Sequence, residues 1–275
     1  VGTLVGEENR GLEYMFIMMN AARFGVGIQG VGLAEHAYQG AVAFAKDRVQ
    51  SRDVAGSSGP VTIIHHPDVR RMLMSMRSQT EAARALSYVG AALSDLAHHH
   101  PDEATRTANL AIYEYLVPVI KGWATEMSEQ VARDGVQVHG GMGFIEETGA
   151  AQHYRDAKIL TIYEGTTAIQ ANDLVGRKTV RDGGAVAKAL IAQIRDVERQ
   201  LGEAQNADFT AIAQRLQEGS AALEQVVEYV VANIRTDVKA VFAGSVTYLK
   251  LAGIVLGGWQ MARAALAAQK RLDAG

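Results

Sequence analysis

Apolar residues recur at helical spacing over most of the chain. From Arg10 to about Gln50 the residues are compatible with one long helix that contains a cluster of glycines. A second helix is predicted to start at Pro67, which the first turn of a helix tolerates, and to run to the break at 98–101. Its apolar face recurs at steps of three, four or seven residues. This face consists of Val69, Met72, Met76, Ala83, Leu86 and Leu93.

A third long helix is predicted over Asp102–Asp134, with a kink at Pro118. The stretch Gly135–Gly149 (GVQVHGGMGFIEETG) is rich in glycine, and we expect it to be largely loop. Residues 51–60 (SRDVAGSSGP) form another predicted loop. A short helix is expected over Ala150–Ala157.

A turn is predicted at Tyr163–Gly165, and Thr166 or Thr167 can cap a helix that runs to about Arg181. The RDGG sequence at 181–184 marks a boundary, because the pattern changes beyond it. Two apolar stripes follow, and Val238–Leu272 can form a third helix. The stripes are Val186, Leu190, Ile194, Val197 and Leu201, then Ile212, Leu216, Leu223, Val226, Val230 and Ile234. Three amphipathic helices with short connections predict an appended helical bundle.

The composition agrees with an all-α protein. The 275 residues are 48% apolar but only 6% aromatic, and all four prolines lie within the first 118 residues. Few prolines and many small residues favour long helices whose axes approach closely. An all-β protein would need more turn prolines and more aromatic and β-branched residues. With no cysteine, the chain has no disulfides and no thiolate metal site.

The charge and the apolar runs indicate few special partners. The net charge of −3 predicts no nucleic-acid binding. The apolar run around Leu251–Gln260, about ten residues long, is shorter than a membrane span requires, so we expect no transmembrane segment and a cytoplasmic protein. The first residues (VGTLVGEENRGLEYMF) lack an initiator Met and a signal peptide, which predicts a fragment of a longer chain.

Two conspicuous patterns have simpler interpretations than their motifs suggest. Gly25, Gly27 and Gly30 match G-x-G-x-x-G, but a dinucleotide site needs a preceding strand, and the preceding residues are helix-like. We therefore interpret them as small residues that allow a neighbouring helix to pack closely. The run His98–His100 lacks ligand spacing, and histidine is favourable at a helix C-terminus, so we assign no metal.

The segment 137–170 (QVHGGMGFIEETGAAQHYRDAKILTIYEGTTAIQ) combines several chemically useful features. Its glycines allow a ligand to approach the backbone. Glu164 lies in a turn just before a helix start, where hydroxyls and free N–H groups of Thr166 and Thr167 can bind a polar ligand. Glu164 is thus a candidate general base. The alternative is an acid that stabilises the N-terminus of its own helix.

These residues resemble the C-terminal half of an acyl-CoA dehydrogenase. The resemblance rests on IYEGTTAIQ, preceded by QVHGGMGF and RDAKI, and on NAARFGVGIQGVGLAEHAYQGAVAFAKDRVQ upstream. It implies a remnant of a missing β-barrel domain at 1–10 and a four-helix-bundle domain at 11–182. An additional helical domain at 183–275 is similar to the longer bacterial subgroup that includes the 3-methylmercaptopropionyl-CoA dehydrogenases.

The resemblance also implies a reaction. Glu164 would remove the α-proton of an acyl-CoA thioester while the β-hydrogen leaves as hydride to FAD, which gives the trans-2-enoyl-CoA. Some family members carry the base before an arginine on the first long helix, but here Ala22 precedes Arg23. Arg23 matches the family's active-site arginine; alternatively it is a helix-surface arginine in a salt bridge. Tyr163 and Gly165 would line the thioester pocket.

FAD is the implied cofactor. Arg48 matches the arginine that reaches the FAD pyrophosphate of a neighbouring subunit, since a guanidinium suits phosphate geometry. Gln137, Gly140 and Gly141 match the loop along the FAD adenosine and diphosphate, and Thr166 matches a hydroxyl contact to FAD. The sequence departs from the family pattern near the adenine contacts. Ser51 and Arg52 replace a common Phe-Gly pair, and Ala168 stands where glutamine is frequent.

The resemblance implies a homodimer or homotetramer and electron-transferring flavoprotein as the electron acceptor. Two alternatives stay open: an acyl-CoA oxidase, in which O₂ reoxidises the flavin, and a non-catalytic helical scaffold that kept the fold. Because the implied FAD site is shared with the missing β-barrel domain, we expect the 275 residues alone to be inactive.

Overall fold

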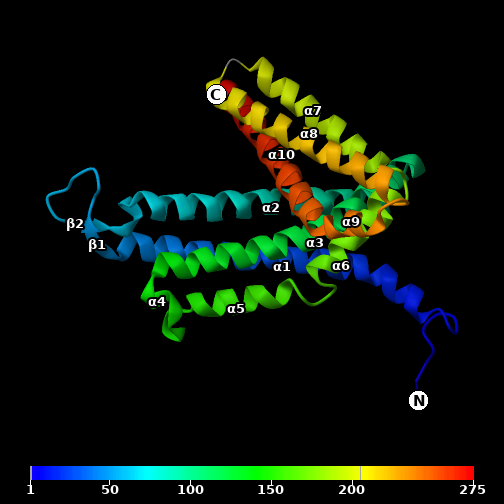
Figure 1. The fold of residues 1–275 in the computed structure, drawn as a ribbon, viewed down its shortest axis with the longest axis horizontal. Helices are drawn as coiled ribbons and strands as arrows, with labels where there is room; N and C mark the ends of the chain where they lie inside the picture. Colours follow the sequence, from blue (N-terminus) through cyan, green and yellow to red (C-terminus); the bar gives the residue numbers. More distant parts are fainter. Residues whose placement is uncertain (1, 205) are drawn as a thin grey trace.

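The computed structural model describes residues 2–204 and 206–275, and long helices dominate it. Helices α1 (Gly11–Asp47), α2 (Pro67–His99) and α3 (Glu103–His139) lie side by side, and α5 (Ala150–Leu160) packs against α1 and α3 (Figure 1). These four form the first bundle. The predicted all-α class and the start of α2 at Pro67 are confirmed.

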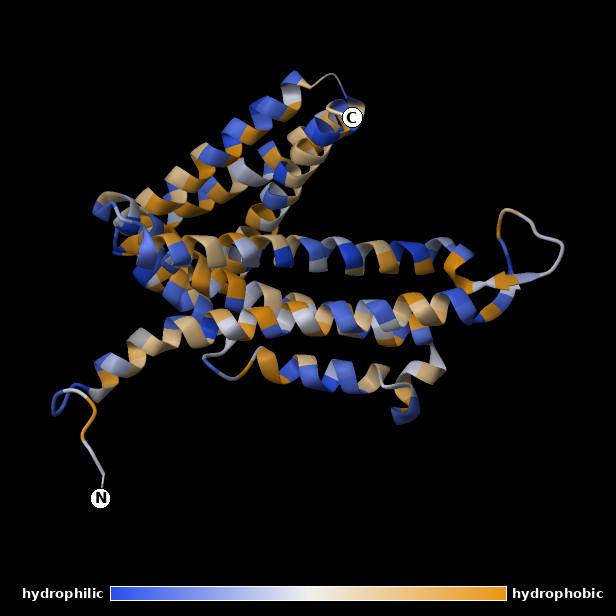
Figure 2. Ribbon diagram, turned by 180° about the vertical axis from the view of Figure 1, so that it is seen from behind, coloured by the Kyte–Doolittle hydropathy of each residue, from blue (hydrophilic) through white to orange (hydrophobic). Residues whose placement is uncertain are grey.

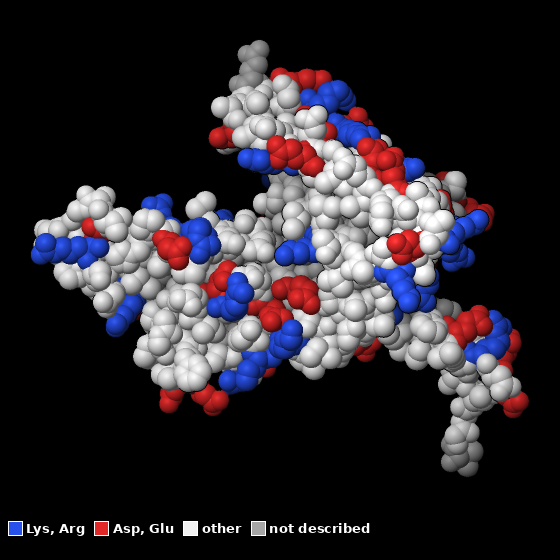
Figure 3. Space-filling view, viewed as in Figure 1, with Lys and Arg blue, Asp and Glu red and all other residues white. Residues whose placement is uncertain are grey.

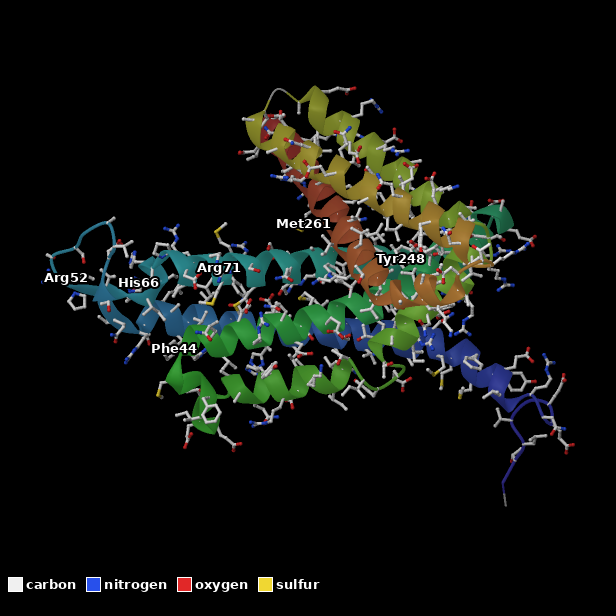
Figure 4. The ribbon with its side chains drawn as sticks, viewed as in Figure 1. Phe44, Arg52, His66, Arg71, Tyr248 and Met261 are labelled. Atoms are coloured by element: carbon white, nitrogen blue, oxygen red, sulfur yellow. The ribbon has the colours of Figure 1, made fainter. Side chains whose placement is uncertain are left out.

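Short elements close one end of this bundle. Strands β1 (Val49–Arg52) and β2 (Pro60–Thr62) pair antiparallel around an exposed loop, and the 3₁₀ helix η1 (Ile63–His65) leads into α2. At the same end lie α4 (Gly141–Phe144) and the 3₁₀ helix η2 (Glu146–Thr148). Figure 4 marks this end by Phe44 and His66.

The predicted loop at Gly135–Gly149 is wrong, because most of this stretch is helical. Gly135 lies inside α3, and a Cβ there would be 3.6 Å from the Ala37 carbonyl oxygen of α1. This is an ordinary van der Waals distance, so Gly135 belongs to the contact between α1 and α3 and does not reverse the chain. Gly140, with φ +59°, is where α3 ends. Helix α3 continues through Pro118.

The second half of the chain turns back onto the first. Helix α6 (Thr167–Asp173) continues into the π-helical η3 (Leu174–Val180), and a turn at 181–184 leads to α7 (Ala185–Glu203). Then α8 (Ala207–Asn233) and α9 (Val238–Ala243) precede α10 (Ser245–Asp273), which packs across α2, α3 and α6. Figure 2 shows apolar residues concentrated where α3, α6 and α10 meet.

Glycines make close helix approaches in the first bundle. A Cβ on Gly27 would lie 2.6 Å from Ile120 Cγ2, and one on Gly30 would lie 2.9 Å from the Ala124 carbonyl oxygen. At Gly25 no such neighbour is within 4 Å. Two of the three glycines of the G-x-G-x-x-G pattern therefore pack α1 against α3, and the pattern lies within a helix.

The indole of Trp123 on α3 is seated against two glycines of α10. A Cβ on Gly253 would lie 2.1 Å from Trp123 Cγ, and one on Gly257 would lie 2.7 Å from Trp123 Cη2. Nearby, the buried hydroxyl of Tyr248 on α10 lies 2.9 Å from the hydroxyls of Tyr115 and Thr179 (Figure 4). These contacts fix α10 on the first bundle.

Helix α10 is long and apolar enough to cross a membrane, with a mean hydropathy of 1.3 over its best 18-residue window. A count of uninterrupted apolar residues in the sequence missed this. Of that window, 44% is buried inside the protein, and a core helix passes the same test. At the other end of the chain, residues 2–10 form no strand, and Val1 lies outside the described residues.

Candidate active site

The predicted turn at Tyr163–Gly165 is confirmed and connects α5 to α6. Glu164 has a left-handed backbone (φ +54°), followed by Gly165 at φ +87°. Thr166 is the N-cap of α6, and its Oγ1 accepts a hydrogen bond from the Ile169 N–H at 3.4 Å. A left-handed glutamate is uncommon and must be held by its surroundings.

Two buried side chains hold this turn from the bundle side. Lys121 Nζ donates to the carbonyl oxygens of Leu160 (2.9 Å) and Gly165 (2.7 Å). Gln170 Nε2 donates to the carbonyl oxygens of Glu164 (3.1 Å) and Gly165 (3.2 Å). Burial lowers the pKa of Lys121 to about 8, with a further lowering from the charge of Arg23.

The Glu164 side chain contrasts with these anchors. It is half-buried, and within the described part of the chain its carboxylate makes no hydrogen bond or salt bridge. Ile162 and Tyr163, which precede it, and Ile169 on α6 are exposed apolar residues. The turn therefore carries an unpaired carboxylate in a segment with several exposed apolar side chains.

Arg23 comes from α1 and is buried, not a helix-surface residue. Its Nη1 donates to Asp173 Oδ2 at 2.9 Å, and the other oxygen of Asp173 accepts from Arg177 Nε at 2.7 Å. Arg23 Nε is buried and finds no partner among the residues described. The salt-bridge interpretation of Arg23 thus holds, but inside the protein.

Further hydrogen bonds join the turn to α1 and α3. The Tyr163 hydroxyl donates to Gln29 Oε1 of α1. Thr167 Oγ1 donates to Glu126 Oε1 of α3 at 2.5 Å. Together with Lys121, these contacts bring residues far apart in sequence to one place.

The other predicted residues lie at the opposite end of α5. Arg48 caps α1, while Gln137, Gly140 and Gly141 lie where α3 ends, and all four are exposed. The rings of Phe44 and His139, 4.4 Å apart, join these two helix ends. Eleven residues of α5 span about 16 Å, so the structure separates the nine predicted site residues into two groups.

A cavity of about 650 Å³ opens between α2, α3, α6 and α10. It is mostly apolar, with Met261 of α10 on its wall (Figure 4). Thr167 and Ala168 reach its edge, but Glu164 does not line it. We therefore place the candidate site on the outer side of the turn. Charges of both signs are scattered over the face shown in Figure 3. No group of three potential metal-binding side chains occurs in residues 2–204 and 206–275.

Sequence reasoning missed Lys121, Gln170 and Asp173. A signal for Lys121 was present, because it is the single charge in the apolar run VPVIKGWA. A lysine on the buried face of a helix needs hydrogen-bond acceptors. Its partners could not be named, since they lie 39 and 44 residues away.

Comparison with known proteins gives the family. Residues 9–178 match the family model "Acyl-CoA dehydrogenase, C-terminal domain", and residues 190–275 match "Acetyl-CoA dehydrogenase C-terminal like". The chain is 53% identical over 275 residues to the 3-methylmercaptopropionyl-CoA dehydrogenase of Ruegeria pomeroyi. It is 34% identical over 288 residues to a broad-specificity linear acyl-CoA dehydrogenase of Mycobacterium tuberculosis. Both alignments cover this whole chain and 46% of the relative, so the chain spans about half the length of these curated relatives.

Solved structures agree on the fold. An acyl-CoA dehydrogenase from Bacillus anthracis, crystallised with FAD, superposes with a TM-score of 0.71 at 22% identity. The match covers 98% of this chain and 45% of that one. A butyryl-CoA dehydrogenase from Megasphaera elsdenii matches 62% of this chain and 39% of its own, with a TM-score of 0.50 at 32% identity. The chain belongs to the acyl-CoA dehydrogenase family, whose C-terminal helical domain it contains.

Proposed function

We propose that the enzyme containing this chain oxidises an acyl-CoA thioester to the trans-2-enoyl-CoA, with Glu164 as the base. The observation that supports this most is the unpaired carboxylate on a left-handed turn whose backbone is held by Lys121 and Gln170. A structural glutamate would be expected to have a partner, whereas a base needs a fixed backbone and a free carboxylate.

In the proposed reaction Glu164 takes the α-proton, and the β-carbon loses a hydride as the Cα–Cβ double bond forms. Bound FAD supplies the hydride acceptor. The Glu164 N–H would donate to the thioester carbonyl and stabilise the negative charge that develops there. Tyr163 and Gly165 would line the same pocket. Arg23 is only 6% exposed, so we propose that it acts through its charge rather than by contact.

The second group of residues fits the phosphates of FAD. Arg48 is exposed and makes one long contact, at 3.4 Å to Gln50 Oε1, so its guanidinium is available. A Cβ on Gly140 or Gly141 would meet no atom within 4 Å, which leaves the backbone open to a ligand. We propose that these residues and Gln137 bind the adenosine diphosphate half of FAD.

The separation of the two groups supports an oligomer. Thr166 lies beside Glu164 and would contact the FAD used by that base, whereas Arg48 lies at the far end of α5. We propose a homodimer or homotetramer in which Arg48 and its neighbours bind the FAD of the adjacent subunit. Electron-transferring flavoprotein is the proposed electron acceptor.

We also propose a division of the chain. Residues 1–10 would follow a β-barrel domain, 11–182 would be the catalytic helical bundle, and 183–275 would be an appended helical domain. The proposed boundary falls between the two ranges matched by family models. The isolated 275 residues are expected to lack activity, because the proposed FAD site would be shared with the proposed β-barrel domain.

The test is Glu164→Gln in the flavin-loaded enzyme, with Glu147→Gln, an exposed acid on η2, as the control. Flavin reduction by 3-methylmercaptopropionyl-CoA and by butyryl-CoA is followed anaerobically from the loss of oxidised-flavin absorbance. We expect Glu164→Gln to slow reduction at least about 100-fold and the control to leave it unchanged. Reduction of the Glu164→Gln flavin at the wild-type rate would reject the assignment.

A further inference from the structure

A fully buried lysine lies behind the proposed base. Lys121 is 0% exposed, although it belongs to the middle of α3 with apolar neighbours on both sides in sequence. Burying an ammonium is costly unless it is well hydrogen-bonded. Its two recorded acceptors are both backbone carbonyls of the segment that carries Glu164, one on each side of that residue.

These two hydrogen bonds fix a conformation that the backbone would otherwise avoid. The Leu160 carbonyl belongs to the last turn of α5, and the Gly165 carbonyl directly follows the left-handed Glu164. Gln170 Nε2 also donates to the Gly165 carbonyl and to the carbonyl of Glu164 itself. The backbone carbonyls of Glu164 and Gly165 are therefore both hydrogen-bonded to buried side chains. Surroundings that over-determine a strained residue are characteristic of functional sites.

We propose that Lys121 is a positioning residue for the reaction: by binding the carbonyls that flank Glu164, it fixes the left-handed turn and aims the carboxylate at the α-proton. This inference rests on the proposed function. Lys121 acts through the backbone and does not contact the substrate. A shift of about 1 Å in a reacting group costs on the order of 100-fold in rate, so its loss should be visible in catalysis.

The charge of Lys121 strengthens its hold on the turn. The charged groups that act on it are Arg23 from α1, Glu126 from its own helix and Glu164 from the turn. Hydrogen bonds from a charged donor are stronger than those from a neutral one, so a neutral amide at this position should hold the two carbonyls less firmly.

Three variants of the flavin-loaded enzyme test this. Lys121→Met removes both donors and the charge, whereas Lys121→Gln keeps N–H donors without the charge. The control is Lys178→Met on η3, a largely buried lysine whose Nζ binds Glu114 Oε2 at 2.9 Å, away from the turn. The anaerobic rate of flavin reduction by saturating 3-methylmercaptopropionyl-CoA is measured, and FAD content and the thermal midpoint are recorded for each variant.

We expect Lys121→Met to slow reduction about 10-fold to 100-fold, with FAD still bound. Lys121→Gln keeps N–H donors, so it should reduce flavin faster than Lys121→Met but more slowly than the wild type, and Lys178→Met should keep the wild-type rate. If Lys121→Met does not fold, the rate of Lys121→Gln decides the question. A wild-type rate in the folded Lys121 variant, or an equal loss in Lys178→Met, overturns the inference.

The Glu164→Gln variant separates this inference from the proposed function. If Glu164→Gln is inactive and the Lys121 variants behave as wild type, only the positioning role fails. If Glu164→Gln reduces flavin normally, the base itself is wrong, whatever the Lys121 variants do.

Discussion

Replacement of Gly253 by alanine tests how α10 docks on the first bundle. The added methyl would lie 2.1 Å from Trp123 Cγ, 2.5 Å from Cδ2 and 2.6 Å from Cβ. A rotamer change of the indole would move Cγ and Cδ2 but not Cβ, whose position the backbone of α3 fixes, so it cannot relieve the whole clash. Either α10 must move away from α3, or the Trp123 side chain must move away from Gly253 and Gly257.

The magnitude follows from two opposing effects. Overpacking of a buried contact costs about 1–3 kcal/mol, and three contacts under 3.0 Å place this case near about 3 kcal/mol. Alanine in place of glycine inside a helix stabilises the folded state by about 1 kcal/mol through its higher helix propensity. We therefore expect Gly253→Ala to lower the free energy of unfolding by about 2 kcal/mol. For a protein of this size, that lowers Tm by about 4–8 °C.

Gly258→Ala on the same helix is the matched control, because a Cβ there meets nothing within 4 Å. It should gain the helical preference of alanine without a clash, about 1 kcal/mol. Thermal and urea unfolding, followed by the helical circular dichroism signal, compare the two variants. If Gly253→Ala proves as stable as Gly258→Ala, α10 does not rest on Trp123, and the described docking is refuted.

Three other predictions concern ionisable groups that the fold buries wholly or in part. Asp173→Asn leaves Arg23 with a weakened partner inside the protein and should cost about 3 kcal/mol in urea unfolding; a loss under about 1 kcal/mol would contradict this. Since burial lowers the pKa of Lys121 to about 8 while the unfolded chain keeps about 10.5, stability should rise with pH between those values, and Lys121→Met should abolish that rise. Burial and the nearby His36 lower the pKa of His153, so stability should fall as pH drops below about 6.5. His153→Gln should reduce that loss in acid unfolding, and an unchanged pH profile would exclude His153 as its source.

Local signals in the sequence predicted much of the fold. Pro67 and the histidine–proline break gave both ends of α2, and the Glu-Gly-Thr turn with its capping threonine was found as predicted. Such features depend on a few neighbouring residues. The glycine-rich composition of 135–149 predicted a loop wrongly, because Gly135 and Gly143 lie within helices, while Gly140 and Gly149, which have positive φ, lie between helical elements.

The anchoring of the proposed base could not be read from the sequence. Lys121 and the Gly165 carbonyl are 44 residues apart, and their contact exists only once α3 and α5 are packed together. The separation of Arg48 from Glu164 is likewise set by how the helices pack, so the sequence alone did not show it. Motif matching assigned nine residues to substrate and cofactor and Arg48 to the FAD of a neighbouring subunit, but only the fold shows that α5 separates two groups of these residues.

Because α5 fixes the distance between these two groups, some segments of the chain should tolerate insertions and others should not. One residue inserted into α5 would move everything beyond it by about 1.5 Å and rotate it by about 100°, so Glu164 would leave its anchors. The exposed loop at 53–59 carries no such constraint, since it only closes a hairpin. Insertions should therefore accumulate between β1 and β2, while the interval between Gly141 and Glu164 stays fixed in length.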